Sequence, residues 1–167
     1  MLTPGQPPAT LARDGIARRI PHQGNMCLLD EVTGWDAQHI MCQTRSHQAS
    51  DNPLRAHGRL GAACGVEYAA QAMAVHGALM GEALAEGGNT RPRAGYLASV
   101  RSVSLLVTQL DTQSGPLTVS AERVTGDDNT ALYSFELRAS TKILLRGRAV
   151  VVLDAAALSA EPAVGGN

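Results

Sequence analysis

The sequence is poor in aromatic residues and lacks long apolar runs. Only 3% of its 167 residues are aromatic although 44% are hydrophobic, so the core has to be built from Ala, Val, Leu and Ile. No apolar run approaches the roughly 18–20 residues that span a bilayer, which argues against a membrane protein. A signal peptide needs an apolar region near its start, where this chain has Pro4, Pro7, Pro8, Arg13 and Asp14. We therefore expect a cytoplasmic protein.

Charge and cysteine content exclude further classes. The formal net charge is −1, so no excess of basic residues predicts binding to nucleic acid or to a membrane surface. Cys27, Cys42 and Cys64 are odd in number and form no CxxC pair. Three reduced thiols that pack as small apolar side chains are expected, rather than a zinc site or a disulfide framework. The sequence predicts neither a metal nor a bound cofactor.

The length predicts a single domain with a substantial core. Residues 1–19 are expected to form a flexible lead, residues 20–154 the domain, and residues 155–167 a flexible tail rich in Ala, Gly, Ser and Pro. Residues 46–59 carry turn residues without periodicity and predict a loop. A structureless loop of that length in a compact domain is usually functional or disordered.

The most informative segment is a predicted helix over residues 61–85 that is apolar on nearly every side. Such a helix is expected to be buried, yet it carries Glu67 in its first turns, and a buried carboxylate needs a partner or a function. Strand-like segments precede it at residues 27–35 and 39–45, and four more follow within residues 95–153. This order predicts an α+β fold with an antiparallel sheet curled around the helix. Two sheets joined edge to edge in a dimer would give the helix further cover.

Three segments in and around the predicted helix carry recognisable motifs: Ile20–Val32, Glu67–Ala72 and Gly95–Arg101. In this order they resemble the N-terminal Pro-His segment, the Glu-x-x-Ala-Gln signature of the central helix and the following strand of the 3-hydroxyacyl-(acyl carrier protein) dehydratases of the hot-dog fold. The combination resembles most the dehydratase-like subgroup encoded with aryl-polyene synthases. The resemblance covers roughly residues 20–153 and implies a hot-dog fold, a substrate on phosphopantetheine of an acyl carrier protein, and a homodimer or a heterodimer with a related subunit.

One departure from the family concerns the catalytic histidine. Housekeeping dehydratases carry a Gly-His-Phe-Pro motif whose His precedes the helix Glu by fourteen residues, and this chain has Pro53 at that position. His22 is the preferred replacement, because its segment resembles one that lines the acyl tunnel in the family. His57 and His47 in the loop are the alternatives. Without any such His, the chain would be a non-catalytic partner subunit.

The chemistry implied by the resemblance assigns a role to each candidate. Dehydration needs a base for the α-proton, for which a neutral imidazole is suited, and an acid for the leaving hydroxyl, for which a carboxyl in apolar surroundings is suited. We therefore expect His22 as the base and Glu67 as the acid or water-orienting group. Gln71, one turn beyond Glu67, is expected to hold its carboxylate. The remaining predicted substrate-binding residues are Gly65, Val66 and His57, with the amides of residues 64–66 as an oxyanion site.

Simpler interpretations compete with these roles. Glu67 could cap the helix N-terminus, His22 could bond backbone groups, and Gln71 could serve packing alone. His76 is expected to be a core or interface residue and His39 a surface residue. A thioesterase would also place a carboxylate on the helix to activate water, so fold alone does not separate the two activities.

Overall fold

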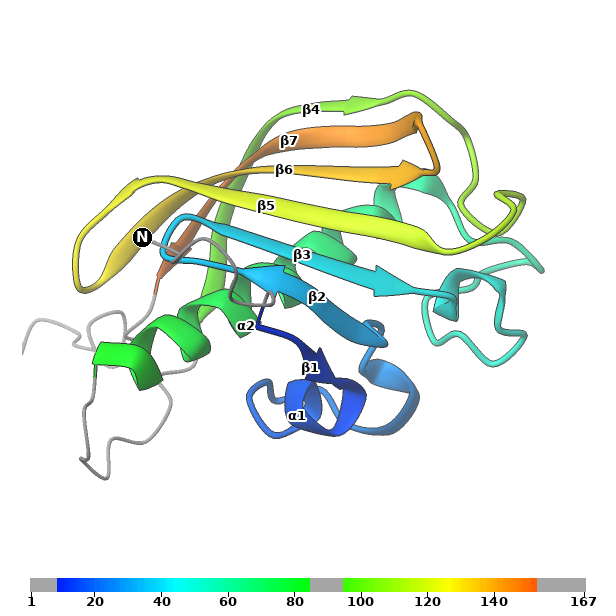
Figure 1. The fold of residues 1–167 in the computed structure, drawn as a ribbon. Helices are drawn as coiled ribbons and strands as arrows, with labels where there is room; N and C mark the ends of the chain where they lie inside the picture. The colour runs from blue at the N-terminus through cyan, green and yellow to red at the C-terminus, as the bar shows by residue number, and fades with distance from the viewer. Residues whose placement is uncertain (1–8, 85–94, 153–167) are drawn as a thin grey trace, which may run out of the picture.

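The computed structural model describes residues 9–84 and 95–152. Within these ranges one seven-stranded antiparallel sheet has the order β1-β2-β3-β5-β6-β7-β4 and partly encloses one long helix, α2 (Figure 1). The strands are β1 (Leu11–Ala12), β2 (Glu31–Trp35), β3 (His39–Thr44), β4 (Tyr96–Leu105), β5 (Leu117–Gly126), β6 (Thr130–Ala139) and β7 (Lys142–Val152); the helices are α1 (Arg13–Ala17) and α2 (Gly65–Leu84), and the 3-10 turns are η1 (Gly24–Met26), η2 (Ser46–Gln48) and η3 (Ala62–Cys64).

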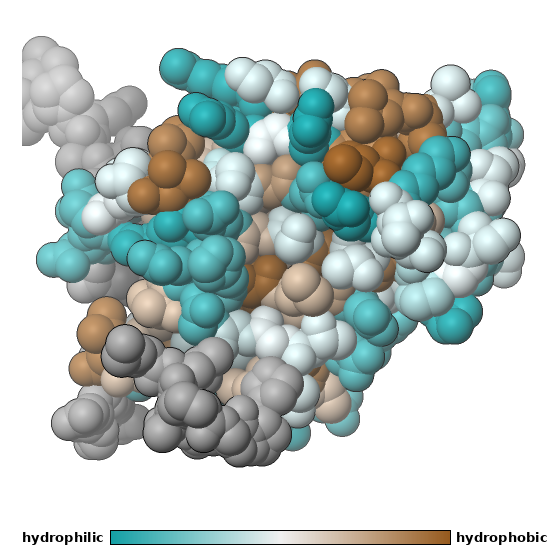
Figure 2. Space-filling view, turned by 45° about the horizontal axis from the view of Figure 1, so that its top comes forward, coloured by the Kyte–Doolittle hydropathy of each residue, from teal (hydrophilic) through white to brown (hydrophobic). Residues whose placement is uncertain are grey.

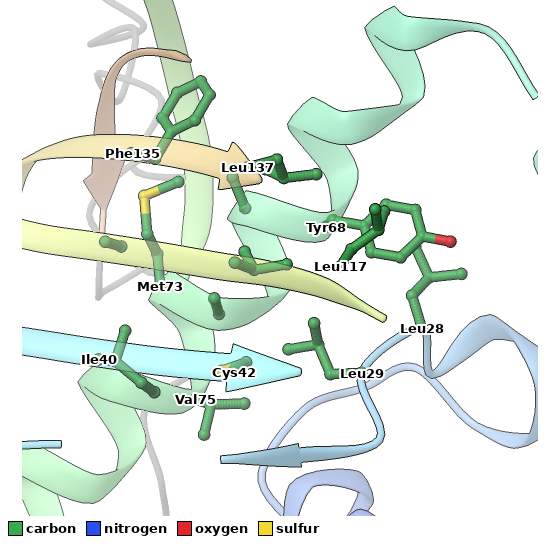
Figure 3. Close-up of a cluster of buried hydrophobic side chains, with 14 of the residues drawn as sticks. Leu28, Leu29, Ile40, Cys42, Tyr68, Met73, Val75, Leu117, Phe135 and Leu137 are labelled. Atoms are coloured by element: carbon green, nitrogen blue, oxygen red, sulfur yellow. The ribbon is translucent and has the colours of Figure 1, made fainter. Parts of the chain in front are cut away.

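The sheet shows the alternation of a surface that is buried on one side only. Along β6, buried residues alternate with half-exposed ones from Ala131 to Ala139. The buried series faces α2, which packs against β3, β5 and β6. Side chains from α2, the central strands and the segment before β2 meet there in one core (Figure 3). The other face of the sheet carries mainly polar side chains, as expected for an antiparallel sheet with one face outside the core.

Small residues let α2 lie close against the sheet. A side chain at Gly65 would collide with the Leu145 side chain and crowd that of Leu137, both of which are fully buried. Glycine at the first residue of α2 is therefore required by helix–sheet packing. Gly65 is also a predicted substrate-binding residue; the space that its Cβ would take is filled by Leu137 of β6 and Leu145 of β7.

Three boundaries differ from the sequence prediction. Residues 9–19 do not form a flexible lead: they include β1 and α1, and Ile16 is fully buried in the core. The strand predicted from Cys27 begins only at Glu31, because Leu28 and Leu29 pack in the core without ladder partners. The long helix begins at Gly65 after the 3-10 turn η3. Its predicted end at residue 85 and the predicted tail lie outside the described residues.

An antiparallel sheet wrapped around one long helix is the hot-dog architecture, and the predicted α+β fold class is confirmed. The described helices include none with the length and apolar character of a membrane span.

Candidate active site

The predicted pair, His22 and Glu67, is in direct contact. His22 Nε2 lies 3.0 Å from Glu67 Oε1, although the two residues come from separate parts of the chain. Glu67 stands in the first turn of α2, and His22 belongs to the segment between α1 and β2. This distance is within the range required for proton transfer between an acid and a base. The geometry thus unites the two residues, while their catalytic roles remain a proposal.

Gln71 links α2 by hydrogen bonds to the segment between α1 and β2 that contains His22. Its Nε2 donates to Met26 O (2.8 Å) and lies 3.4 Å from Glu67 Oε1, while its Oε1 accepts from Leu28 N (2.9 Å). The two backbone partners determine which end of the amide is which, since a carbonyl only accepts and an N–H only donates. The predicted contact between Gln71 and Glu67 is present. Gln71 is 1% exposed, so its amide is a buried bridge between α2 and the segment that carries His22.

A second polar cluster next to Glu67 was not predicted. The Tyr68 hydroxyl lies 2.8 Å from Ser46 Oγ and accepts from Asn52 Nδ2 (3.0 Å), and Ser46 Oγ in turn donates to Leu28 O (2.7 Å). Leu28 is therefore held on its N–H by Gln71 and on its carbonyl by Ser46. A tyrosine in an apolar helix signals that its hydroxyl needs a partner. The sequence does not say which loop supplies that partner, because the contact depends on how residues 46–52 fold back.

The carboxylate is less buried than the sequence predicts. The Glu67 side chain is 36% exposed and that of His22 29% exposed, so the expectation of a buried Glu is wrong for the single chain. His22 Nδ1 is enclosed and has no hydrogen-bond partner among the described residues. Nδ1 is therefore not the atom of His22 that a substrate can reach.

Two of the backbone amides that were predicted to form an oxyanion site at the start of α2 already donate hydrogen bonds within the chain. The Cys64 amide donates to Gly61 O (3.1 Å), and the Gly65 amide donates to the carbonyls of Ala62 and Ala63. The reason is that η3 runs directly into α2, so the preceding turn satisfies amides that a helix start would otherwise leave open. The prediction is wrong for these two amides. Val66 is half-buried and packs against the core.

The other histidines lie elsewhere. His57 is exposed in a turn with φ +53°, and no hydrogen bond or ion pair among the described residues joins it to His22 or Glu67. His47 is fully buried, with Nε2 3.1 Å from Gln113 O, and burial lowers its pKa. His76 is buried between Tyr133 and Asp36, as expected for a core residue. His39 is exposed, also as expected.

Two cavities of the described structure lie away from the pair. A groove of about 650 Å³ on the polar face of the sheet is lined by residues of β2 to β7, and a cavity of about 290 Å³ lies between α1 and the loop after β3. Neither is lined by His22 or Glu67. Among the described residues, no three His, Cys, Asp or Glu side chains gather as metal ligands would.

Solved structures share the fold of this chain. The dehydratase heterocomplex ApeI:P from Xenorhabdus doucetiae matches with a TM-score of 0.71 at 22% identity, covering 83% of this chain and 90% of the other. The thioesterase HI1161 from Haemophilus influenzae matches with a TM-score of 0.52 at 14% identity, covering 73% and 76%. A hypothetical thioesterase with coenzyme A from Streptococcus pneumoniae matches with a TM-score of 0.53 at 13% identity, covering 74% and 84%. These likenesses show the hot-dog fold alone.

Sequence comparison identifies the family. A search of curated proteins gives no significant match. The model of the ApeP-like family, described as ApeP dehydratase, matches residues 15–160, which is most of the chain and includes both His22 and Glu67. The chain therefore belongs to the ApeP-like dehydratase family.

Proposed function

We propose that this protein removes water from a 3-hydroxyacyl thioester carried on the phosphopantetheine of an acyl carrier protein, in a fatty-acid-like or polyene biosynthesis. The observation that supports this most is the 3.0 Å contact between His22 Nε2 and Glu67 Oε1 within a chain of a dehydratase family. An imidazole and a carboxyl in contact form an acid–base pair of the kind that the elimination requires.

The geometry suggests how the pair would act. With the shared proton on Glu67, His22 Nε2 accepts a hydrogen bond from it in the resting pair. When the substrate hydroxyl on C3 takes over that hydrogen bond, the Nε2 lone pair becomes free to accept the proton from C2 of the substrate. Glu67 then donates its proton to the hydroxyl on C3, which leaves as water while the C2–C3 double bond forms. Afterwards the proton on His22 returns to Glu67 across the 3.0 Å contact, and the pair is restored. Gln71 and the N-terminal end of the α2 dipole keep the carboxylate in place.

The proposed enzyme also needs a second hot-dog subunit. Strand β4 is at the free edge of the sheet and carries, with Leu106 just after it, a row of exposed large apolar side chains: Tyr96, Leu97, Val103, Leu105 and Leu106. The chain after β4 runs to the start of α2, where Thr108 O accepts from Ala62 N (3.0 Å). A subunit paired with β4 would thus adjoin the half-exposed His22–Glu67 end of α2.

The experiment is a mass-spectrometric assay of the protein with a 3-hydroxyacyl thioester on a carrier protein. We expect the product to be lighter by one water, and His22→Ala and Glu67→Ala each to slow its formation by about 10²–10⁴-fold. His39→Ala is the matched control, an exposed histidine without contact to the pair, and it is expected to keep full activity.

Other products would change the assignment. Release of a free acid would identify a thioesterase that uses Glu67 to activate water. Absence of turnover in the protein alone, with turnover restored by a partner in which His22→Ala has no effect, would identify a non-catalytic subunit and overturn the proposed roles.

A further inference from the structure

The groove on the polar face of the sheet runs across the strands rather than along them. Its lining includes two rows of residues that the register aligns from β3 through β5 and β6 to β7. One row consists of Met41, Ser120, Glu136 and Arg146, and the other begins at His39 and ends at Arg148. On each strand the two rows are two residues apart, so their side chains project from the same face and form opposite walls of the groove.

The dimensions of the groove are those of a small-molecule site. Its volume of about 650 Å³ lies within the range of about 300–1,000 Å³ that is typical of ligand pockets. From β3 to β7 the groove crosses three strand intervals of about 4.8 Å, or about 14 Å in all. An extended molecule of that length can lie between the two walls. Neither His22 nor Glu67 lines the groove, so its occupant would not fill the proposed active site.

Three arginines without acidic partners gather at the β7 end of the groove. Arg146 and Arg148 stand in opposite walls, and Arg101 of β4 lies directly opposite Arg148. All three are exposed, and no hydrogen bond or ion pair engages their guanidinium groups within residues 9–84 and 95–152. Like charges that face each other across a ladder are destabilising. A bound anion would remove this repulsion, and the guanidinium fork matches the paired oxygens of a carboxylate or a phosphate.

The acidic residues of the groove favour an anion with a single charge. Glu136 lies opposite Arg146 in register, but its Oε1 contacts Arg138 instead. Glu122 is held near His39, with 3.9 Å between Glu122 Oε1 and His39 Nε2. These two carboxylates reduce the positive potential along the groove. A carboxylate ligand with one negative charge therefore fits the site better than a phosphate monoester, which carries about −1.5 to −2 at neutral pH.

The remainder of the groove is suited to an apolar chain. Ser120 and Ser134, in the middle of the walls, are small and leave room for a ligand. At the β3 end, Met41 is an exposed large apolar residue, and Trp35 of β2 lines the same end. Figure 2 shows hydrophilic side chains in separate patches on this side of the molecule, with pale and apolar surface between them. A hydrocarbon chain that crosses the sheet would bury its end against Met41 and Trp35.

We propose that this groove binds a linear free carboxylate with an apolar chain, up to about 14 Å long. The carboxylate lies between Arg146 and Arg148, and the chain crosses β6 and β5 towards Met41. The site is separate from the His22–Glu67 pair and does not rest on the proposed dehydration.

The fluorescence of Trp35 reports binding at the groove, because Trp35 is the only tryptophan of the sequence and lines this site. Octanoate is titrated into the full-length protein, and isothermal titration calorimetry measures the same dissociation constants independently. We expect saturable binding to wild type. Arg146→Gln/Arg148→Gln should raise the dissociation constant at least about tenfold, because it removes two charge-assisted hydrogen-bonding partners. Arg146→Lys/Arg148→Lys keeps the charge without the planar fork and should lose less affinity.

Matched variants and probes separate this site from general charge and from misfolding. Arg18→Gln/Arg59→Gln changes the same number of exposed arginines elsewhere and should bind octanoate as wild type does. The probe 1-octanol lacks the charge and acetate lacks the chain, so each should bind at least about tenfold more weakly than octanoate. Octyl phosphate should also bind more weakly. Circular dichroism establishes that each variant folds; if the glutamine variant does not, the lysine variant carries the test.

Four results would overturn the proposal. The first is no binding of octanoate by either method. The second is equal affinity in wild type and in the folded arginine variants, which would place octanoate at another site. The third is acetate bound as tightly as octanoate, which would make the arginines a site for an adventitious ion only. The fourth is tighter binding of octyl phosphate than of octanoate. None of these results depends on the dehydration assay, so failure of the proposed function remains distinguishable.

Discussion

His76 shows how a buried polar pair restricts protonation. Its Nε2 donates to Asp36 O (2.8 Å), so Nδ1 accepts from the Tyr133 hydroxyl (2.8 Å). Burial raises the pKa of Tyr133 to about 12, which keeps this hydroxyl a donor. Burial also lowers the pKa of His76 from its ordinary 6.5. The folded protein therefore favours the neutral imidazole.

This arrangement predicts a loss of stability in mild acid. Because the pKa of His76 is lower in the folded than in the unfolded chain, its contribution is present above about pH 6.5 and is lost as the pH falls below it. The free energy of unfolding, measured by urea denaturation between about pH 7.5 and 5.5, should decrease with falling pH. His76→Gln should reduce that slope, whereas His39→Gln, at an exposed site, should leave it unchanged. An equal slope in wild type and His76→Gln would contradict the assignment.

The contact between His22 and Glu67 could be predicted from the sequence, because their motifs resemble those of a dehydratase family, and the two side chains are 3.0 Å apart. Their exposure and the use of the Cys64 and Gly65 amides by η3 could not be predicted, because both depend on how the chain enters α2. The Ser46–Tyr68–Asn52 cluster could not be predicted either, since it depends on the folding of a loop without periodicity.

At the scale of elements, the sheet and the long helix could be predicted from periodicity, and their ends could not. Alternating residues identified the strands of the hairpins, and the apolar run identified α2. The N-terminal β1 and α1 were missed because each is too short to show a period. Ile16 is fully buried and holds this segment in the core. No local sequence pattern predicts that burial.

The close packing of α2 on the sheet predicts different effects on stability for alanine substitutions at two glycines of this helix. Gly65→Ala should lower the free energy of unfolding by about 1–3 kcal/mol, because its Cβ would collide with the buried Leu145 side chain. Gly81→Ala meets no atom within 4 Å and should be neutral or stabilise by up to about 1 kcal/mol, because alanine is the better helix former. Chemical denaturation of both variants tests this. Equal effects at the two sites would show that packing at Gly65 is looser than described.

At the scale of the whole molecule, the open edge of the sheet and the half-exposed His22–Glu67 pair both agree with the proposed second subunit. Strand β4 ends next to the start of α2, so a subunit paired with β4 would extend over that end of the helix. The sequence predicted dimerisation from the apolar helix. In the structure, the exposed apolar residues that favour dimerisation lie instead on β4 and directly after it.

The apolar end of β4 should contribute measurably to subunit pairing. Leu105→Gln/Leu106→Gln removes two side chains that are 48% and 53% exposed in the single chain, so it should leave thermal stability nearly unchanged. It should raise the dissociation constant of subunit pairing, measured by analytical ultracentrifugation, by about tenfold or more. Full burial of a leucine contributes about 1.5–3 kcal/mol, and about half of each side chain is still exposed in the single chain. Met41→Gln on β3, a site 49% exposed and away from that edge, is the control. Undiminished pairing of the leucine variant would exclude this part of the edge.

The central claim is that His22 and Glu67 act as one acid–base pair, and a double-mutant cycle tests it most directly. The rate of dehydration is measured under single-turnover conditions for wild type, His22→Ala, Glu67→Ala and the double variant. The account predicts that the double variant is about as slow as the slower single variant, because removing either partner already disables the pair. If the double variant is instead slower than wild type by the product of the two single effects, the residues act independently, and this result would contradict the account.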